Sequence, residues 1–400
     1  MRYRRPGPWK SPVEPELFIG AMSGTSLDGV DAVLAALSPL SPLSPLSSGS
    51  ASALPVVRAA VHIPYADALR QRILALCQGQ RVSLGEIGEV DQQVAQAYAQ
   101  AVLQLLKDTG VAAGAVRAIG AHGQTVHHQP LGEWRFSTQL GDPNALAVAT
   151  GITVVADFRR RDMALGGQGA PLAPGFHDLV LRHPGRPRVV LNCGGIANIS
   201  VLLPGRDCLG YDTGPANILL DAWIEARQGA RFDRDGQWAA QGQVHRPLLQ
   251  ALQSDPYFAL PPPKSSGREH FNLGWLLRHL ERLAQADQLS PPTPSEADVQ
   301  RTLLELSAST VAQAVQRHAD EGELLVCGGG ARNALLMARL AALLPRWTVS
   351  STAAHGIEPE HVEALAFACF AQRTLQGLPG NLPQVTGASR ACILGGIYPV

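Results

Sequence analysis

Residues 18–34 read FIGAMSGTSLDGVDAVL, and this stretch decides how we interpret the rest of the chain. An apolar run leads into Ser-Gly-Thr-Ser, and apolar residues resume at Val30, beyond Asp28 and Gly29. The pattern predicts a strand, a tight turn and a second strand. Residues 54–65, LPVVRAAVHIPY, predict a third strand that would close an antiparallel meander.

The turn between the first two predicted strands has the composition of a phosphate-binding turn. Gly24 lets the backbone approach a ligand that a Cβ would hold off, and the hydroxyls of Thr25 and Ser26 add donors to the amides of the turn. Asp28 and Asp31 stand beside it, as acids would if a divalent metal bridged the phosphate. An ordinary hairpin with a polar turn explains these residues about equally well.

Composition narrows the class of protein. The chain has 400 residues, 46% of them apolar, and its 33 basic and 33 acidic residues give a formal net charge of zero. This length predicts two domains or large lobes, and the balanced charge favours neither nucleic acid nor an acidic membrane as a partner. No apolar run is long enough to cross a bilayer. Six cysteines without a CxxC pair favour reduced thiols and a cytoplasmic location.

Two segments predict no regular structure. Residues 1–16 begin basic but meet prolines in place of an apolar run, so we expect a disordered tail and no signal peptide. Residues 38–53 are a triplet run of Ser, Pro and Leu, which we interpret as a surface loop inserted in the first lobe, between two strands.

Polar residues follow two further strands. VRAIGAHGQTVHHQP predicts a buried strand running into a polar loop that carries His122, Gly123, Gln124 and Thr125. The carboxyl end of a strand is where α/β folds bind ligands, although a satisfied histidine in a turn explains His122 equally well.

The strand ITVVADF, residues 152–158, runs into three arginines and then into Gly-Gly-Gln-Gly. A solvated charge run is the ordinary explanation. The position between a buried strand and glycines favours ligand contact instead, because arginine forks suit carboxylates and phosphates. The candidates are Asp157, Arg159, Arg161 and Gln168.

The second half of the chain repeats the opening plan. Residues 189–205 predict a strand, a glycine turn and a strand, with Gly194 and Gly195 as a second backbone cradle. Residues 208–223 add a third strand and a helix, and Asp212 ends that strand, although a helix N-cap explains it equally well. The repeat predicts two lobes of like topology facing a cleft.

We place the first lobe at 17–150 and the second at 151–400, with the alternative that the final strand returns to the first lobe. The second lobe also carries ELLVCGGGARNALLMARL, a strand, three glycines and a helix. There Gly328, Gly329 and Gly330 would let a flat ring lie on bare backbone. The absence of GxGxxG and of GxxxxGK[ST] argues against a dinucleotide fold and a P-loop.

Two meanders with polar turns and a late glycine turn resemble the sugar kinase, heat-shock chaperone and actin superfamily. Within it, the chain most resembles the anhydro-N-acetylmuramic acid kinases of bacterial cell-wall recycling. The matching segments run in order from Gly20 almost to the C-terminus: GAMSGTSLDGVD, GAHGQTVHH, TQLGDPN, TVVADFRRRDMALGGQGAPL, LNCGGIANIS, GYDTGPANILLDAW, PPKSSGREHFN, CGGGARNALLM and PGNLPQVTGASR.

Small departures accompany the match. The superfamily usually has an early aspartate where this chain has Met22, but the later acids are this family's own pattern. The family often has glycine where Ala216 stands and a larger hydrophobic residue at Cys193.

The resemblance implies an α/β fold of two lobes with ribonuclease-H-like topology around a central cleft, the actin-like ATPase fold. It implies a kinase that uses ATP and Mg²⁺ to phosphorylate O6 of 1,6-anhydro-N-acetylmuramic acid while water opens the anhydro bridge. The product would be N-acetylmuramic acid 6-phosphate. The enzyme would be a homodimer, and it would bind a small sugar as its substrate.

The resemblance also implies roles for single residues. Asp212 would be the base that activates water, and Glu363 matches a family acid whose role is unassigned. The nucleotide, with Mg²⁺ at Asp28 and Asp31, would be held by Gly24, Thr25, Ser26, Leu27, Asp28, Gly29, Val30, Asp31, Gly194, Gly195, Gly328, Gly329, Gly330 and Asn333. The sugar would be held by His122, Gly123, Gln124, Thr125, Asp157, Arg159, Arg161 and Gln168.

Two alternatives remain. A nucleotide-gated regulatory protein would share both lobes without turning over a sugar, but it would lack the polar residues around Asp212 and in DFRRRD, which are present. A kinase for a free hexose would share the ATP half, and turnover on the anhydro and the hydrated sugar would separate the two.

Overall fold

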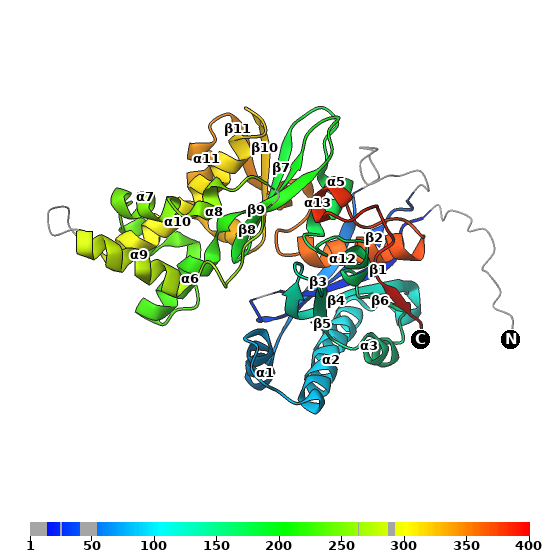
Figure 1. The fold of residues 1–400 in the computed structure, drawn as a ribbon. Helices are drawn as coiled ribbons and strands as arrows, with labels where there is room; N and C mark the ends of the chain where they lie inside the picture. The colour runs from blue at the N-terminus through cyan, green and yellow to red at the C-terminus, as the bar shows by residue number, and fades with distance from the viewer. Residues whose placement is uncertain (1–13, 25, 41–53, 263, 287–292) are drawn as a thin grey trace, which may run out of the picture. The chain divides into compact units, whose positions relative to one another are not determined.

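A computed structural model describes residues 14–24, 26–40, 54–262, 264–286 and 293–400. The predicted tail, 1–16, and the predicted inserted loop, 38–53, lie almost entirely outside these residues. The chain forms two compact units: the first runs to Ala170 and takes in Glu363–Asn381 and Ala388–Val400, and the second comprises Pro171–Val362 and Leu382–Gly387 (Figure 1). Residues 151–170, which we had assigned to the second lobe, thus fall in the first unit.

The first unit is built on a seven-stranded sheet in the order β12-β6-β4-β1-β2-β3, with β5 paired to β4. The meander is confirmed, since β1 pairs antiparallel with β2 and β2 with β3. β4 is parallel to both β1 and β6, and the final strand, β12, pairs with β6. The strands are β1 (Glu16–Ser23), β2 (Gly29–Leu37), β3 (Val56–Pro64), β4 (Val116–Gln129), β5 (Phe136–Leu140), β6 (Val154–Ala156) and β12 (Gly396–Tyr398).

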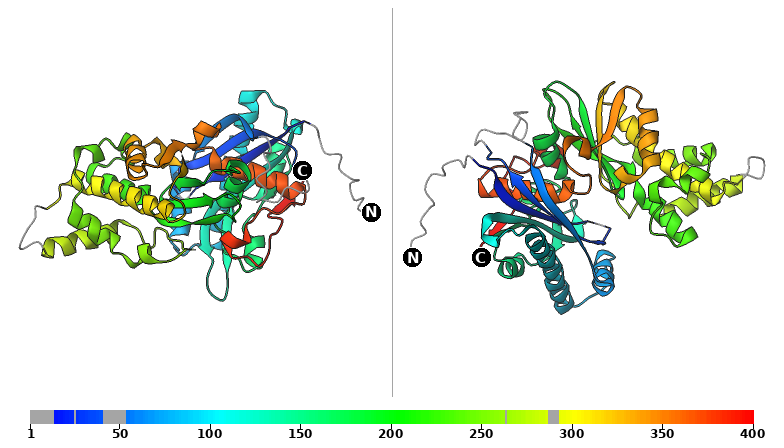
Figure 2. Two further views of the ribbon diagram at one scale, coloured as in Figure 1. Left: turned by 90° about the horizontal axis from the view of Figure 1, so that it is seen from above. Right: turned by 180° about the vertical axis from the view of Figure 1, so that it is seen from behind.

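Helices cover both faces of the first sheet. The long helix α2 packs on the face formed by Ile19 and Ala21 (Figure 2). On the other face Gly20 and Gly120 meet α12, so closely that a Cβ on either glycine would overlap the α12 backbone. The helices are α1 (Asp67–Cys77), α2 (Leu84–Thr109), η1 (Ala113–Ala115), α3 (Pro143–Thr150), α4 (Arg160–Ala164) and α12 (Val362–Leu375).

The second unit has a five-stranded sheet in the order β11-β10-β7-β8-β9. β7, β8 and β9 form an antiparallel meander, and β10 is parallel to β7 and β11. The strands are β7 (Arg188–Cys193), β8 (Ile196–Leu202), β9 (Leu209–Pro215), β10 (Gly322–Cys327) and β11 (Trp347–Ser351). The helices are α5 (Ala173–Leu181), α6 (Asn217–Gln228), η2 (Arg234–Gly236), η3 (Ala239–Gln241), α7 (Arg246–Gln253), α8 (Pro256–Ala259), α9 (Leu273–Ala286), α10 (Glu296–Gln316), η4 (Gly329–Arg332), α11 (Ala334–Leu343), η5 (Thr352–His355) and α13 (Pro383–Thr386).

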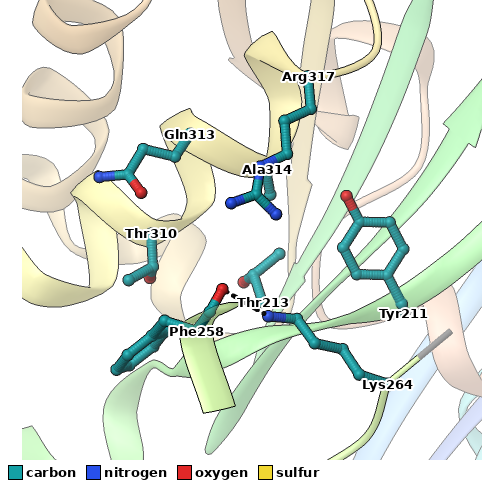
Figure 3. A pocket seen from close by; sticks show the side chains of 8 residues that line it. All are labelled: Tyr211, Thr213, Phe258, Lys264, Thr310, Gln313, Ala314 and Arg317. Atoms are coloured by element: carbon teal, nitrogen blue, oxygen red, sulfur yellow. Dashed lines mark hydrogen bonds between the residues drawn. The ribbon is translucent and has the colours of Figure 1, made fainter. Parts of the chain in front are cut away.

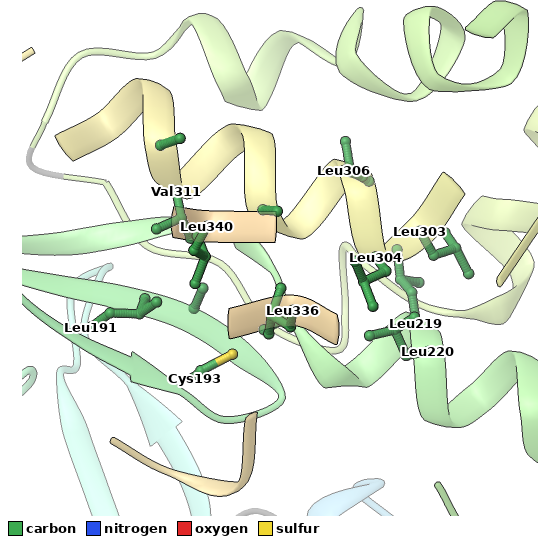
Figure 4. Close-up of a cluster of buried hydrophobic side chains, with 14 of the residues drawn as sticks. Leu191, Cys193, Leu219, Leu220, Leu303, Leu304, Leu306, Val311, Leu336 and Leu340 are labelled. Atoms are coloured by element: carbon green, nitrogen blue, oxygen red, sulfur yellow. The ribbon is translucent and has the colours of Figure 1, made fainter. Parts of the chain in front are cut away.

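The core of the second unit lies between its sheet and the helices α6, α10 and α11. Figure 4 shows part of it, where leucines of the three helices meet side chains of β7. The labelled residues are Leu191, Cys193, Leu219, Leu220, Leu303, Leu304, Leu306, Val311, Leu336 and Leu340. Burying apolar area on this scale is what stabilises each unit on its own.

Five strands of each sheet have the same order and the same relative directions in the two units. Across each sheet they lie in the order β3-β2-β1-β4-β6 in the first unit and β9-β8-β7-β10-β11 in the second. Each sheet is an antiparallel meander continued by two parallel strands. Along the chain, a long helix precedes the first of these parallel strands, α2 before β4 and α10 before β10. This is the ribonuclease-H-like topology of the actin-like ATPase fold, so the predicted fold class is confirmed. Within the described residues, no helix is both long and apolar enough to span a bilayer.

Candidate functional site

The turn between β1 and β2 exposes the carboxylate of Asp28, and buried side chains on either side of Asp28 hold the backbone in place. The Ser26 hydroxyl donates to Asp28 Oδ1 over 2.7 Å, and the Asp28 side chain is exposed. Leu27, at φ 58°, and Val30 are both buried in the core of the first unit. They can therefore offer a ligand only their backbone. Thr25 lies outside the described residues.

The two glycines of this turn serve different purposes. A Cβ on Gly24 would make only an ordinary contact, 3.7 Å from Ser26 Oγ. A Cβ on Gly29 would overlap the Ile63 carbonyl and come within 2.7 Å of Pro64 Cα. Gly29 is therefore required for the packing of β2 on β3, whereas the space over Gly24 stays open to a ligand.

Asp31, on β2, is already paired. Its Oδ1 lies 2.8 Å from Nδ1 of His62, and both side chains are 44% exposed. Among the described residues, no group of three or more His, Cys, Asp or Glu side chains could by itself hold a metal ion. Mg²⁺ is usually held by one or two carboxylates together with phosphate oxygens and water. The exposed carboxylate of Asp28, just before β2, with Asp31 near the start of that strand, suits that kind of site.

The sequence predicted a loop at the polar residues His122 to Thr125, and this prediction is wrong. They lie within β4, which continues to Gln129 because β5 pairs with this second half of the strand. β1 ends opposite Gln124, so that His122, Gly123 and Gln124 lie beside its last residues and Thr125 lies just past its end. Their contact with a ligand stays a prediction.

Hydrogen bonds tie this part of β4 to the first turn. The Gln124 amide, fully buried, donates to the Gly24 carbonyl over 3.3 Å. The Ser23 hydroxyl lies 2.8 Å from the Tyr98 hydroxyl and donates to the Gly123 carbonyl over 3.3 Å. Neither Ser23 nor Tyr98 was among the predicted site residues, because nothing near them in the sequence marks the pairing. Thr125 is held by β5, accepting a hydrogen bond from Gln139.

His122 and Arg159 form a buried pair. Nε and Nη2 of Arg159 lie 3.0 and 2.8 Å from Nε2 of His122. Burial and the positive charge of Arg159 hold the pKa of His122 well below its usual value, so the imidazole is neutral and accepts. Burial lowers the pKa of Arg159 to about 10, and the charges of Glu363 and Asp162 oppose that shift. The arginine therefore stays charged, and Glu363 gains an electrostatic partner.

Arg159 also holds the glycine turn that follows it. Its Nη1 donates to the Gly169 carbonyl over 2.7 Å, and the Gly169 amide donates to the fully buried Asp162 over 2.8 Å. The second oxygen of Asp162 accepts from Asn381. Asp162 and Asn381 anchor the turn although the sequence analysis did not select them. Within the described residues, the bonds of Arg159 to Gly169 and His122 use three of the five donors of its guanidinium.

The remaining predicted sugar ligands lie around this pair. Asp157, at φ 60°, ends β6, and burial raises the pKa of its carboxyl. Its carboxylate forms an ion pair of 3.5 Å with Arg160. Arg161 is exposed and Gln168 is partly buried. The structure thus gathers Gly24, Gln124, His122 and Arg159 into one network.

The glycine turn between β7 and β8 is bound to the start of α6. The carbonyls of Gly194 and Gly195 accept from the amides of residues 216–218 over 2.9–3.1 Å. A Cβ on either glycine would make only ordinary contacts. The first amides of α6 are therefore used by protein carbonyls, and a ligand at this turn would have to use other donors.

The turn of three glycines after β10 lies on the end of β7. Gly328 has φ 77°, and a Cβ there would come within 2.6 Å of Asn192 Oδ1, while one on Gly330 would overlap Cys193 Sγ. Around Gly329 no described atom lies within 4 Å of that position. Asn333 caps α11, accepting from the Leu336 amide over 3.0 Å. Open backbone at Gly329 suits a flat ring, whereas the oxygen of Asn333 is already used.

Asp212 lies within β9, and the alternative role as a helix N-cap is excluded because Ala216 occupies that position. A register shift against β8 leaves Thr213 as an extra residue beside it. Such bulges frequently accompany active sites, where they re-aim a side chain.

A second segment, the Lys264–Ser266 loop, holds Asp212 from the edge of the sheet. The Asp212 amide donates to the Lys264 carbonyl over 3.0 Å, and the Ser266 amide donates to Asp212 Oδ2 over 2.9 Å. The Tyr257 hydroxyl donates to the Asp212 carbonyl. From the described part of the chain, no hydrogen bond reaches the other carboxylate oxygen, Oδ1. It is therefore free to accept from a water molecule.

Burial raises the pKa of the Asp212 carboxyl to about 6. The Ser266 amide and the Lys264 ammonium oppose the shift, and Glu269 adds to it. A carboxylate with this pKa is ionised at neutral pH and more basic than an ordinary aspartate, as a general base requires. Sequence reasoning selected Asp212 but missed Tyr257, Lys264 and Ser266, whose pairing with it spans about fifty residues.

Comparison with solved structures finds low identity over most of the chain. An activator of the 2-hydroxyisocaproyl-CoA dehydratase from Clostridium difficile, with bound ADPNP, is 11% identical over 90% of this chain and 96% of its own, with a TM-score of 0.43. A ROK family glucokinase from Streptomyces griseus, in complex with glucose and AMPPNP, is 12% identical over 88% and 98%, with a TM-score of 0.36. An inorganic polyphosphate/ATP-glucomannokinase from an Arthrobacter species is 13% identical over 90% and 99%, with a TM-score of 0.36.

These likenesses carry no argument about the site. The sequence comparison is more specific, because a family model described as anhydro-N-acetylmuramic acid kinase matches residues 16–400. That range includes both sheets, the turn after β1, Arg159, Asp212 and the turn of three glycines. The chain therefore belongs to the anhydro-N-acetylmuramic acid kinase family.

Proposed function

We propose that this kinase uses ATP to phosphorylate O6 of 1,6-anhydro-N-acetylmuramic acid while water opens the 1,6-anhydro bridge, giving N-acetylmuramic acid 6-phosphate. The observation that carries the proposal is the state of Asp212. One of its oxygens is held by the Ser266 amide, the other is free, and burial raises the pKa of the carboxyl to about 6. A role in murein recycling, a cytoplasmic location and a homodimer remain predictions.

The substrate makes a water-activating base necessary. O6 of the anhydro sugar is an ether oxygen and carries no proton, so a base cannot activate it as it would a free hydroxyl. Water must add to C1 as the C1–O6 bond breaks and O6 bonds to the γ-phosphorus of ATP with loss of ADP. The water proton passes to Oδ1 of Asp212. This resembles an inverting glycosidase in which the phosphoryl group, in place of an acid, takes the leaving oxygen.

The first turn is our candidate for the phosphates of ATP. Its backbone is open above Gly24, and the Ser26 hydroxyl and Asp28 carboxylate are exposed beside it. When bound, Mg²⁺ would neutralise the charge that develops on the phosphoryl oxygens. Asp28 is the acid best suited to hold it, with Asp31 kept in place by His62. The adenosine would lie on the open backbone at Gly329.

The network around Arg159 is our candidate for the sugar. The guanidinium would face the lactyl carboxylate with the N–H groups that its bonds to His122 and Gly169 do not use, and the bond to neutral His122 orients it. The buried Gln124 amide and the Gly169 turn would contact the polar groups of the ring.

Turnover in ¹⁸O-water tests the reaction directly. With the anhydro sugar and ATP, label is expected at C1 of the product and none in the phosphate, because water attacks carbon. Label in inorganic phosphate would mean simple ATP hydrolysis and would contradict the proposal. The same assay with hydrated N-acetylmuramic acid and with glucose should give little turnover. Faster turnover on either sugar would indicate an ordinary hexose kinase.

The rate should depend on pH through Asp212. Because the carboxylate must be ionised to accept a proton, kcat/KM should rise with pH up to about pH 6 and change little just above it. Roughly one pH unit below the pKa only about a tenth of the carboxyl is ionised, so the rate falls about tenfold per unit. Glu269→Gln should move this limb to lower pH, since the charge of Glu269 raises the pKa. If kcat/KM were constant from about pH 5 to about pH 7, Asp212 would be excluded as the titrating base.

A further inference from the structure

A polar hollow in the second unit has no part in the proposed reaction. It lies between the second half of α10 and the side of β9 that carries Tyr211, and it is open to solvent. Asp212, the next residue in β9, points to the other face of the strand. The residues that line it are Tyr211, Thr213, Phe258, Lys264, Thr310, Gln313, Ala314 and Arg317 (Figure 3).

Two cations of the hollow face each other across it. Figure 3 shows the guanidinium of Arg317, at the end of α10, turned inward toward the ammonium of Lys264. Lys264 donates to the carbonyls of Tyr257 and Phe258 over 3.0 and 3.3 Å. Neither cation forms an ion pair with a carboxylate of the described residues. Burial lowers the pKa of Lys264, and the charge of Arg317 lowers it further.

The donors of these two side chains are largely unused. An ammonium has three N–H groups and a guanidinium five. Lys264 uses two on the carbonyls of Tyr257 and Phe258, which leaves one. Arg317 is exposed, and in the part of the chain that the structure describes no hydrogen bond takes up a donor of its guanidinium. The hollow thus offers several N–H donors and two positive charges, and an anion bound there would neutralise the two charges.

We propose that this hollow binds a small oxyanion of the phosphate class, held between Lys264 and Arg317. Arg317 would donate a charge-assisted fork of two N–H groups to two of its oxygens, and Lys264 would donate to a third. The site differs from the phosphate turn of the first unit and does not depend on the proposed reaction.

The site is linked to Asp212 through the Lys264–Ser266 loop. The Lys264 carbonyl and the Ser266 amide both bond to Asp212, and the Lys264 charge favours the ionised form of that carboxyl. An anion that neutralises Lys264 would therefore weaken this support. Inorganic phosphate in the hollow would raise the pKa of the base and lower its ionised fraction.

The experiment is a calorimetric titration of inorganic phosphate into the full chain at low salt, without nucleotide or sugar. Wild type should show saturable binding that Arg317→Gln weakens by about tenfold, or about 1.4 kcal/mol. Arg317→Lys, which keeps the charge without the fork, should fall between them. The matched control is Arg206→Gln, which removes the same charge from an exposed position of the same unit, and it should bind like wild type. Lys264 is not varied, because its bonds also hold the loop.

The outcomes separate this site from any other phosphate site. Phosphate that binds only at the turn after β1 would bind equally to all four proteins, which would overturn the proposal. Absence of saturable binding to wild type would overturn it as well. Folding is checked by thermal unfolding in phosphate-free buffer. Arg317→Gln should unfold no earlier than wild type there, since it removes one of two like charges that repel each other.

Discussion

Replacing Asp212 with asparagine is expected to lower kcat by roughly 10²–10⁴-fold, the usual contribution of a general base. The amide cannot take the proton of the attacking water. Its oxygen can still accept from the Ser266 amide, as Asp212 Oδ2 does over 2.9 Å, so the Lys264–Ser266 loop keeps its place. Binding of the sugar and of ATP should therefore change little, which calorimetry on the variant would measure.

Asp207→Asn is the matched control for this variant. Asp207 is an exposed acid of the same unit, and its loss removes the same charge without touching Asp212. Its kcat should equal that of wild type. A near-normal kcat for Asp212→Asn would reject the assignment of the base, whatever the outcome of the labelling experiment.

Gly120→Ala should cause a large loss of stability from a single methyl group. The added Cβ would overlap the Phe367 carbonyl of α12 and come within 3.1 Å of Ala371 Cβ, so the helix must move off the sheet. Overpacking of this kind costs up to about 3 kcal/mol, and a shift of roughly 6–12 °C in Tm follows for a unit of this size. Thermal unfolding followed by circular dichroism would measure it.

Gly114→Ala is the same substitution in the same unit with nothing to displace. Gly114 lies in η1, and no described atom is within 4 Å of an added Cβ. Its Tm should stay within about 2 °C of wild type, because a surface change of this kind is worth little. Equal Tm values for the two variants would mean that α12 does not press on Gly120 as described.

Local patterns were sufficient to predict most elements of the fold. The apolar runs around residues 18–34 are β1 and β2, and Gly110 ends α2 in a left-handed conformation. Asp142 caps α3 and Pro143 lies in its first turn, which is the usual signal for the start of a helix. These signals succeed because caps and strand alternation depend on neighbouring residues. Repetition of the meander then predicted the second unit.

The misassigned segment shows where local patterns fail. His122 to Thr125 have the polarity of a loop, yet they continue β4 because β5 supplies hydrogen-bond partners. Similarly, the three arginines after Asp157 lead into the short helix α4, which directs Arg159 inward while Arg160 stays exposed. Tertiary pairing decided both outcomes, and no residue within the segments records it.

The candidate site was predicted as residues, without their partners. Asp212 and Arg159 follow from motifs, but the bonds that hold them involve Ser266 and His122, 54 and 37 positions away. The pairing of Asp31 with His62 crosses from β2 to β3 in the same way. Such pairings become visible only when the chain folds, and they fix the positions of the functional side chains.

The return of the chain to its first unit has a consequence for synthesis. α12 and β12 come from the last tenth of the sequence, about forty residues, yet α12 covers the glycine face of β1 and β4 and β12 extends the same sheet. During synthesis, β1 to β4 leave the ribosome long before α12 does. The glycine face of this sheet therefore stays exposed until nearly the entire polypeptide has been made. The N-terminal strands of a nascent chain should therefore stay protease-sensitive until α12 and β12 have left the ribosome. Until then, a chaperone could bind the exposed apolar face.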